Sequence, residues 1–278
     1  MRFGSHVSIQ KGYYHAALTA YKMDAGAFQY FPKNPRSLKV KDFDRQDALR
    51  CSEFSREHGL QSIAHTPYPV SLIPAPEKEN EIMSSILNDL EIAEACGSLG
   101  IVAHFGAYRD PDPLEAYKRM IAFLDDILAE WEGNALLLIE NNAGKSGAIG
   151  TTMEEHVQIR KLCDFSEKIG FCLDTCHAFA SGIWTGDNWG DVEQTGLELD
   201  YFQHLKAIHL NNSVYASGSM KDRHANIFSG QLTSRQFEEL LCSPYLQELP
   251  MILETPTSAD YSHKQEIIDL RNLVSKHC

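Results

Sequence analysis

The sequence predicts an α/β fold, a (β/α)8 or TIM barrel made by a single domain over residues 1–278, with an active site at the C-terminal ends of its strands. Three observations support this prediction. Eight short apolar runs alternate with longer amphipathic stretches, and several stretches end in glycine just before the next run, as helix C-termini do. Eight such units within this length fit a closed parallel barrel. The alternative is an open doubly wound sheet, but no G-x-G-x-x-G motif follows an early run.

Each element can be placed by its pattern. The expected strands are Arg2–Val7, Ala25–Phe31, Gln61–His65, Gly100–Phe105, Ala135–Glu140, Gly170–Asp174, Leu205–Leu210 and Pro250–Glu254. Amphipathic helical patterns lie between them, for example over residues 79–97, 114–131, 153–170 and 234–247. No low-complexity linker or break in composition divides the chain, so we expect one domain.

Composition narrows the class of protein. The hydrophobic fraction of 43% suffices for a core, and no apolar run reaches the roughly 20 residues of a membrane span. The N-terminal residues lack the apolar stretch of a signal peptide. The cysteines number seven, an odd count without a C-x-x-C pair, which predicts reduced thiols in a cytoplasmic protein. The net charge of −13 argues against a non-specific nucleic-acid binder, but bound divalent cations could still supply local positive charge.

The strand ends carry the chemistry, because βα-loops form the active site of a barrel. From the third strand onward, each run ends in histidine or carboxylate residues, and more follow in the loops. The candidate metal ligands are His65, His104, Glu140, Asp174, His177, His209, Asp222, His224 and Glu254. Imidazole and carboxylate together suit zinc, manganese or iron.

Each ligand also has an ordinary structural interpretation. A single histidine at a strand end is more often a hydrogen-bonded residue, and an aspartate there commonly caps the next helix. Six consecutive strands that end this way are different, because burying four carboxylates together without cations would be prohibitively costly. Nine ligands are too many for one ion, so two or three metals are expected. Clustered metals are typical of phosphoryl transfer.

Several motifs together resemble a known family. LDTCHAF, IENNAG, HLNN, DRH, LETP and the N-terminal GSHVS and KNPR are similar to endonuclease IV, the zinc-dependent abasic-site endonuclease of DNA repair. The resemblance extends from residue 3 to about residue 256. LDTCHAF and DRH are specific in combination, whereas GSHVS or ETP alone would be weak.

The resemblance implies a trinuclear zinc centre, although manganese shares these ligands. His65, His104 and Glu140 would hold one zinc. Glu140 would bridge to a second zinc, which Asp174, His209 and Glu254 complete. His177, Asp222 and His224 would hold the third, while Cys176 would be structural and point elsewhere.

The implied reaction cleaves the DNA backbone 5′ to an abasic site in damaged double-stranded DNA. A zinc-bridged hydroxide would attack the phosphate, with Glu140 and Glu254 as the catalytic residues. A missing base would make extrusion of the damaged nucleotide cheap. The resemblance further implies a monomer that needs no obligate protein partner and no membrane.

DNA contacts are expected from two segments. The basic run after the second strand places Lys33, Arg36, Lys39 and Lys41 on the catalytic side, although short basic runs are usually solvated loops. An acidic protein that binds DNA needs local positive charge near its site. Tyr68 matches the aromatic residue that enters the duplex in the family. His6 could donate a hydrogen bond to a ligand or simply lie at the rim.

The chain also departs from the family pattern. The departures are Phe105, Asn212, Ser37 with Leu38, and Phe228. None is a ligand, but they alter the surroundings of the ligands and the loops expected to contact DNA.

Two other functions remain open. Sugar isomerases and epimerases of the xylose-isomerase-like barrels resemble this chain in Glu140, Asp174, His209 and Glu254, but such an enzyme does not need the other five ligands. A non-enzymatic metal-binding or nucleic-acid-binding module is the second alternative. The complete ligand set favours the nuclease over both.

Overall fold

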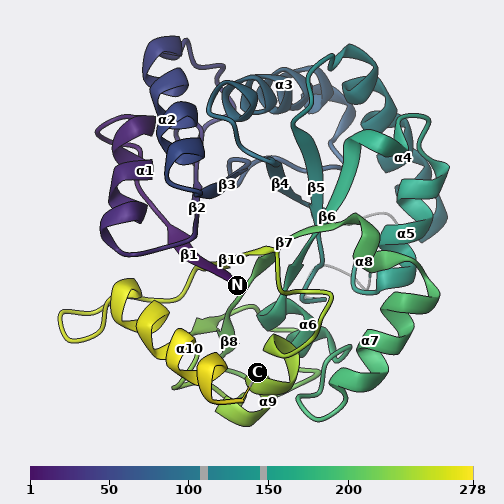
Figure 1. Ribbon diagram of the computed structural model, residues 1–278. Coiled ribbons are helices and arrows are strands. Elements are labelled where there is room, and N and C mark those ends of the chain that lie inside the picture. Colours follow the sequence, from purple (N-terminus) through teal and green to yellow (C-terminus); the bar gives the residue numbers. More distant parts are fainter. Residues whose placement is uncertain (107–111, 145–148, 278) are drawn as a thin grey trace.

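The computed structural model describes residues 1–106, 112–144 and 149–277 and contains a closed parallel barrel of eight strands, as predicted (Figure 1). The order around the barrel is β1-β10-β7-β6-β5-β4-β3-β2. Its strands are β1 (Arg2–His6), β2 (Ala27–Tyr30), β3 (Gln61–His65), β4 (Gly100–His104), β5 (Leu136–Glu140), β6 (Ile169–Asp174), β7 (Leu205–His209) and β10 (Pro250–Leu253). Each strand lies within two residues of the expected range at both ends.

Helices form a ring outside the strands (Figure 1). They are α1 (Tyr13–Lys22), α2 (Arg45–Glu57), α3 (Glu79–Ala95), α4 (Pro113–Glu130), α5 (Met153–Leu162), α6 (Thr175–Ser181), α7 (Trp189–Glu198), α8 (Tyr201–His204), α9 (Ser234–Leu241) and α10 (His263–His277), with 3-10 turns at Pro76–Lys78 and Ser166–Lys168. Side-chain caps define several N-termini. The Thr152 and Thr233 side chains each take part in a capping box, at α5 and α9.

The barrel interior begins with a layer of small and aliphatic side chains, which we call the apolar ring. It consists of Ala27, Ile63, Val102, Leu138, Cys172, Ala207 and Ile252, one from each strand except β1. At this level β1 contributes Gly4, whose neighbours are Ala27 and Ile252. A Cβ at Gly4 would lie 1.8 Å from the Ala27 carbonyl oxygen, so only glycine fits.

A larger apolar core fills the space between the strands and the helices. It is continuous and includes fully buried aromatic side chains such as Phe28, Phe123, Phe171 and Phe237. The two cores hold the strands in fixed register. The C-terminal strand ends are therefore rigid points from which functional side chains can project.

One element of the fold was not predicted. A two-stranded antiparallel sheet, β8 (Asn212–Ser213) with β9 (His224–Ala225), follows β7. Its strands are too short to leave a periodic signal in the sequence. The loop after β7 is therefore an ordered hairpin.

The cysteines follow the prediction only in part. Cys51, Cys96, Cys163, Cys172 and Cys176 are free and buried. Cys242 is disulfide-bonded, so the expectation of reduced thiols is wrong there, and residue 278 lies outside the described residues. Spacing rules detect neighbouring pairs, whereas a disulfide depends on proximity in three dimensions. Over the described residues, no helix is long and apolar enough to cross a membrane.

Candidate metal centre

A second layer of inward-facing side chains lies two residues beyond the apolar ring on every strand. Because side chains alternate between the two faces of a strand, positions i and i+2 point the same way. This layer, which we call the polar ring, consists of His6, Gln29, His65, His104, Glu140, Asp174, His209 and Glu254. Six of the eight are predicted metal ligands. The remaining three predicted ligands are His177 on α6, Asp222 in the loop between β8 and β9, and His224 on β9.

These side chains meet at one cavity of about 390 Å³. The cavity is lined by His6, Phe31, His65, Tyr68, His104, Glu140, His177, Asp222, His224, Glu254, Thr255 and His263. The other two predicted ligands, Asp174 and His209, are fully buried and contact the lining residues. All nine predicted ligands therefore converge on one site.

The first ligand group is His65, His104 and Glu140, whose ligand atoms lie within 4.8 Å of one another. The Nε2 atoms of the two histidines are 3.2 Å apart, and His104 Nε2 lies 2.8 Å from Glu140 Oε2. His65 Nδ1 lies 2.8 Å from the Thr66 carbonyl oxygen, to which it donates. That bond leaves the Nε2 lone pair of His65 facing the group, as in histidines that bind metals.

The second group shares Glu140 and adds Asp174, His209 and Glu254. His209 Nδ1 lies at its centre, 2.8 Å from Glu140 Oε1, 3.4 Å from Glu254 Oε2 and 4.0 Å from Asp174 Oδ2. Three carboxylates thus surround one imidazole nitrogen. Glu140 presents one oxygen to each of the first two groups, which is the geometry of a bridging ligand.

The third group contains His177 and His224, and two carboxylates approach it. Asp222 Oδ2 is 3.3 Å from His177 Nε2, and its Oδ1 is 3.3 Å from His224 Nε2. Asp174 Oδ2 is 3.5 Å from His224 Nε2, so Asp174 joins this group as well as the second. Cys176 does not point elsewhere as expected. Its sulfur lies within 4.8 Å of ligand atoms of Asp222 and His224, and burial raises the pKa of this thiol to about 12.

Asp174 fits both interpretations of an aspartate at a strand end, as a helix cap and as a metal ligand. Its Oδ1 accepts a hydrogen bond of 2.7 Å from the His177 backbone N–H and so caps α6. Its Oδ2 remains turned toward His209 and His224. One carboxylate therefore both starts the helix and serves the ligand cluster.

The charge states of the carboxylates suit cation binding. Burial alone would raise the pKa of Glu140, but His209 and His104 hold it well below its usual value. Burial would likewise raise the pKa of Glu254, and His209 lowers it to about 2. Both carboxylates are ionised at neutral pH. A buried cluster of ionised carboxylates calls for cations.

Two buried ligand atoms test whether metals fit this site. Within the described part of the chain, Glu140 Oε2 and His224 Nε2 form no hydrogen bond of regular geometry and instead face other candidate ligands, His104 Nε2 at 2.8 Å and Asp222 Oδ1 at 3.3 Å. Each belongs to one of the ligand groups, and each could act as a ligand atom. Buried polar atoms are normally satisfied, and nitrogen and oxygen donors in this mixture suit zinc or manganese. The residues fit bound metals.

Several residues that hold the ligands were missed in the sequence. Asn141 brackets the backbone of Asp174 with hydrogen bonds of 3.0 and 2.7 Å, and its carbonyl accepts from His177 Nδ1 at 2.8 Å. Asn211 donates to Asp174 Oδ2 at 2.8 Å and accepts from the Glu254 backbone N–H at 2.9 Å. Both asparagines closely follow a strand-end ligand, which is the signal that could have identified them.

Of the three predicted DNA contacts, two side chains are exposed and one is buried. Arg36 is exposed, and the Tyr68 side chain is 66% exposed at the cavity, with its ring 5.2 Å from Phe31. Lys33 is buried instead, with Nζ 3.0 Å from Asp89 Oδ1 and 2.7 Å from the Ser85 carbonyl oxygen. Its charge serves the packing of the loop on α3 and is not presented to solvent.

His6 and Lys41 also have hydrogen-bond partners within the chain. His6 Nδ1 lies 3.3 Å from Gln29 Nε2, so His6 neighbours the cluster through an amide. Burial lowers the pKa of His6 to about 4, which keeps it neutral and able to accept this hydrogen bond. Lys41 Nζ donates to the Tyr13 hydroxyl at 2.6 Å.

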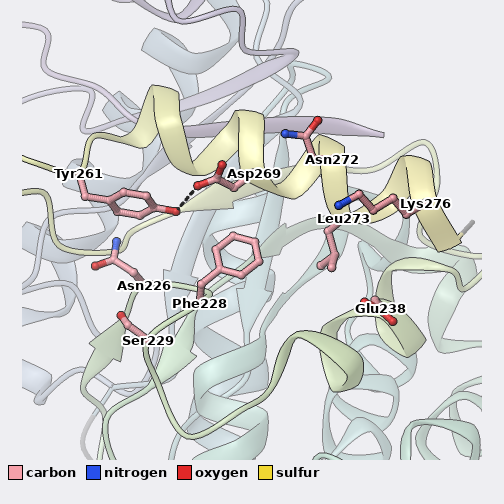
Figure 2. A pocket seen from close by; sticks show the side chains of 9 residues that line it. All are labelled: Asn226, Phe228, Ser229, Glu238, Tyr261, Asp269, Asn272, Leu273 and Lys276. Carbon is pink, nitrogen blue, oxygen red and sulfur yellow. Dashed lines mark hydrogen bonds between the residues drawn. The ribbon is translucent and has the colours of Figure 1, made fainter.

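The departures from the family pattern have different surroundings. Phe105 is fully buried with its ring 5.1 Å from His156, and Leu38 packs against the core. The buried Asn212 amide donates to the carbonyls of Ile227 and Leu232 and so ties the loop after β9. Phe228 lies apart from the metal ligands, in a hollow of about 810 Å³ beneath α10 (Figure 2).

Comparisons with known proteins identify the family of this chain. A model of the xylose isomerase-like TIM barrels matches residues 18–273. The chain is 38% identical over 275 residues to a probable endonuclease 4 of Symbiobacterium thermophilum, and the match covers 99% of this chain and 100% of that protein. It matches the crystal structure of endonuclease IV from Thermus thermophilus with a TM-score of 0.88 and 27% identity, over 99% of this chain and 100% of that one.

The fold extends to enzymes that act on sugars. A 3-keto-D-glucoside 4-epimerase from E. coli matches with a TM-score of 0.69 and 15% identity, over 98% of this chain and 99% of that one. At this identity the likeness shows the fold alone. The relative at 38% identity over almost its whole length decides the family. This chain belongs to the endonuclease IV family within the xylose isomerase-like TIM barrels.

Proposed function

We propose that this protein is a metal-dependent endonuclease that hydrolyses the DNA backbone 5′ to abasic sites in damaged duplex DNA. One observation carries the proposal: three ligand groups that share carboxylates converge on a single cavity. Membership of the endonuclease IV family supports the choice of DNA as the substrate. We further propose that the enzyme acts as a monomer in the cytoplasm.

The proposed centre holds three metals, mainly zinc. The first group is His65, His104 and Glu140, and the second is Glu140, Asp174, His209 and Glu254. The third is His177, Asp222 and His224, with Asp174 close enough to contribute. When bound, such a cluster supplies a Lewis acid for the phosphate and lowers the pKa of water near it.

Two glutamates have the central roles among the protein groups. Glu140 fixes the spacing of the first two groups, because each of its oxygens faces one of them. Glu254 is ionised and its side chain is 21% exposed at the cavity. It can therefore accept a hydrogen bond from the attacking water and orient it toward the phosphate.

The mouth of the cavity supplies the proposed DNA contacts. Tyr68 projects from the loop after β3 and is exposed, as a wedge that enters a duplex must be. Arg36 is an exposed cation of the loop after β2 and is proposed to contact a phosphate. Lys33 is not proposed as a contact, because its ammonium is buried against Asp89.

A sugar isomerase or epimerase is the second candidate. The group of Glu140, Asp174, His209 and Glu254 would serve such an enzyme by itself. The other five ligands then have no role, although they face the same cavity or its lining. The nuclease accounts for all nine.

The test is incision of a duplex that carries one abasic-site analogue. We expect the zinc-loaded protein to cut 5′ to the lesion and leave a 3′-hydroxyl, while an otherwise identical intact duplex stays uncut. Chelation should abolish incision, and added zinc should restore it. A zinc-loaded protein that leaves the abasic duplex intact and epimerises a ketose would establish the second candidate instead.

A further inference from the structure

One member of the polar ring is a glutamine. β2 is a four-residue strand, AFQY, in which every residue is buried, and Gln29 contributes its one amide side chain. We propose that Gln29 is a positioning residue that selects the metal-binding nitrogen of His209 and orients the carboxylate of Glu254. The inference rests on the proposed second metal group.

The hydrogen bonds of Gln29 fix the orientation of its amide. A carboxylate that binds a metal is deprotonated and can only accept, so the amide atom 2.6 Å from Glu254 Oε1 is the Nε2 donor. The other amide proton faces His6 Nδ1, which lies 3.3 Å from Gln29 Nε2 and can accept it. Gln29 Oε1 then faces His209 Nε2 at 2.7 Å. Both N–H donors and the carbonyl of this buried amide are satisfied.

This orientation dictates how His209 is protonated. An amide oxygen only accepts, so His209 Nε2 carries a proton and cannot bind a metal. The nitrogen left for a metal is Nδ1, which lies at the centre of the second group, 2.8 Å from Glu140 Oε1 and 3.4 Å from Glu254 Oε2. Gln29 therefore sets which ring nitrogen becomes the ligand.

Two other ligands use the opposite arrangement. His65 and His177 donate from Nδ1 to backbone carbonyls, each at 2.8 Å, and present Nε2 to their groups. Their orientation is held by the backbone of a strand-end segment. For His209 the same function falls to a side chain from β2, which β1 and β10 separate from β7. β2 carries none of the nine predicted ligands. A substitution of Gln29 on β2 can therefore alter the geometry of the second group without removing a ligand.

Gln29 also controls Glu254. Its donation to Oε1 turns the other oxygen, Oε2, toward His209 Nδ1. The strand order places β10 and β2 on either side of β1, so the amide on β2 reaches a ligand at the end of a strand to which β2 is not hydrogen-bonded. Loss of the amide should release both ligands of one metal and leave the first group untouched.

The experiment compares the parent with Gln29→Met, which keeps length and volume but makes neither hydrogen bond. Zinc release is followed in a chelator competition, and the count of zinc retained per chain is taken at each step. We expect one zinc of the three to bind about 10- to 100-fold more weakly, as when the partner of a ligand is lost. Gln61→Met, at the N-terminal end of β3, removes a glutamine from the opposite end of the barrel and should leave all three affinities unchanged.

Two results would overturn the inference: all three zincs bound as in the parent, or all three weakened equally. Should Gln29→Met fail to fold, Gln29→Asn retains a polar group that is too short to reach both partners, and the same selective loss is expected.

A second measurement needs no substitution. Nitrogen NMR of the zinc-loaded parent should show His209 with a proton on Nε2 and zinc on Nδ1, opposite to His65 and His177. A proton on His209 Nδ1 would contradict the inference. A parent that binds no zinc would instead contradict the proposed function, so the two failures are distinguishable.

Discussion

The apolar ring and the polar ring lie two residues apart on the same strands, yet they have opposite requirements. The apolar ring is complete by itself, because aliphatic side chains satisfy one another by contact. The polar ring gathers Glu140, Asp174 and Glu254 with histidines in a largely buried space, where Glu140 Oε2 faces another candidate ligand, His104 Nε2, at 2.8 Å. The apolar ring stabilises the barrel by itself, whereas the polar ring needs bound cations to balance its buried carboxylates.

The comparison explains how this fold supports chemistry. Because side chains alternate along a strand, each residue of the apolar ring is followed two positions later by a residue of the polar ring. Leu138 precedes Glu140 in this way, and Ala207 precedes His209. Packing of the apolar ring therefore fixes the position of each strand end, whereas the type of side chain at that end can differ from strand to strand. Function should fail when the polar ring is altered, and stability should fail when the apolar ring is altered.

The largest expected effect comes from Glu140→Gln. This change removes the charge shared by the first two ligand groups, so incision of an abasic duplex should fall on the order of 1000-fold or more. The apolar ring is untouched, so the circular dichroism spectrum should match that of the parent. Glu130→Gln, an exposed residue at the end of α4, is the control and should retain full activity. Parent-like single-turnover incision by Glu140→Gln would separate the polar ring from catalysis.

Lys33 offers a comparison with the polar ring, because it is a buried charge whose opposite charge, Asp89, also belongs to the chain. Its ammonium and the Asp89 carboxylate are 3.0 Å apart and almost fully buried. Lys33→Met leaves Asp89 buried without its partner and should lower the free energy of unfolding by about 3–5 kcal/mol. Urea denaturation measures this loss. The double change of Lys33→Met with Asp89→Leu should recover much of it, and no recovery would argue against the ion pair as the cause.

Leu138→Ala breaks the apolar ring directly beneath Glu140. The side chain is fully buried, so its truncation should cost about 2–5 kcal/mol of unfolding free energy. Metal content should stay at the parent value, because the strand and its terminal ligand remain. Leu162→Ala, at a position 62% exposed on α5, should change stability by less than about 0.5 kcal/mol. Loss of metal from a Leu138→Ala protein that is still folded would show that the two rings are not separable.

The smallest effect is expected at Arg36. If its exposed guanidinium contacts a phosphate, Arg36→Ala should weaken binding to abasic and intact duplexes alike and reduce the salt slope of log K by about 1. Arg235→Ala, with a side chain 85% exposed on α9, is the control and should leave the slope unchanged. Fluorescence anisotropy at several salt concentrations gives both slopes. Equal slopes for Arg36→Ala and the parent would remove this loop from the DNA interface.

The sequence predicted the parts of the molecule that depend on local pattern. The strands and the position of the candidate ligands at the strand ends follow from alternation and from residue type, and the apolar core needs no exact partner to be recognised. Gln29 could not be predicted as a partner of His209, because an amide is no typical ligand and its contacts are 180 positions away along the chain. The sequence showed only that Gln29 is a polar residue in a strand expected to be buried.

Lys33 shows the opposite failure. A run of basic residues in a loop indicates a solvated or DNA-contacting surface, and Arg36 and Lys39 are indeed exposed. Only the three-dimensional approach of α3, which brings Asp89 and the Ser85 carbonyl to the ammonium, turns Lys33 inward. Charge patterns in sequence reveal sign but not the packing of individual side chains.

The central claim, that the polar ring and its loop residues form a three-metal centre, is tested most directly by anomalous diffraction at the zinc edge from zinc-loaded crystals. We predict three peaks in the cavity: between His65, His104 and Glu140, beside His209 Nδ1, and between His177, Asp222 and His224. A single peak within the group of Glu140, Asp174, His209 and Glu254, with the other five ligands empty, would contradict the account and support a sugar isomerase.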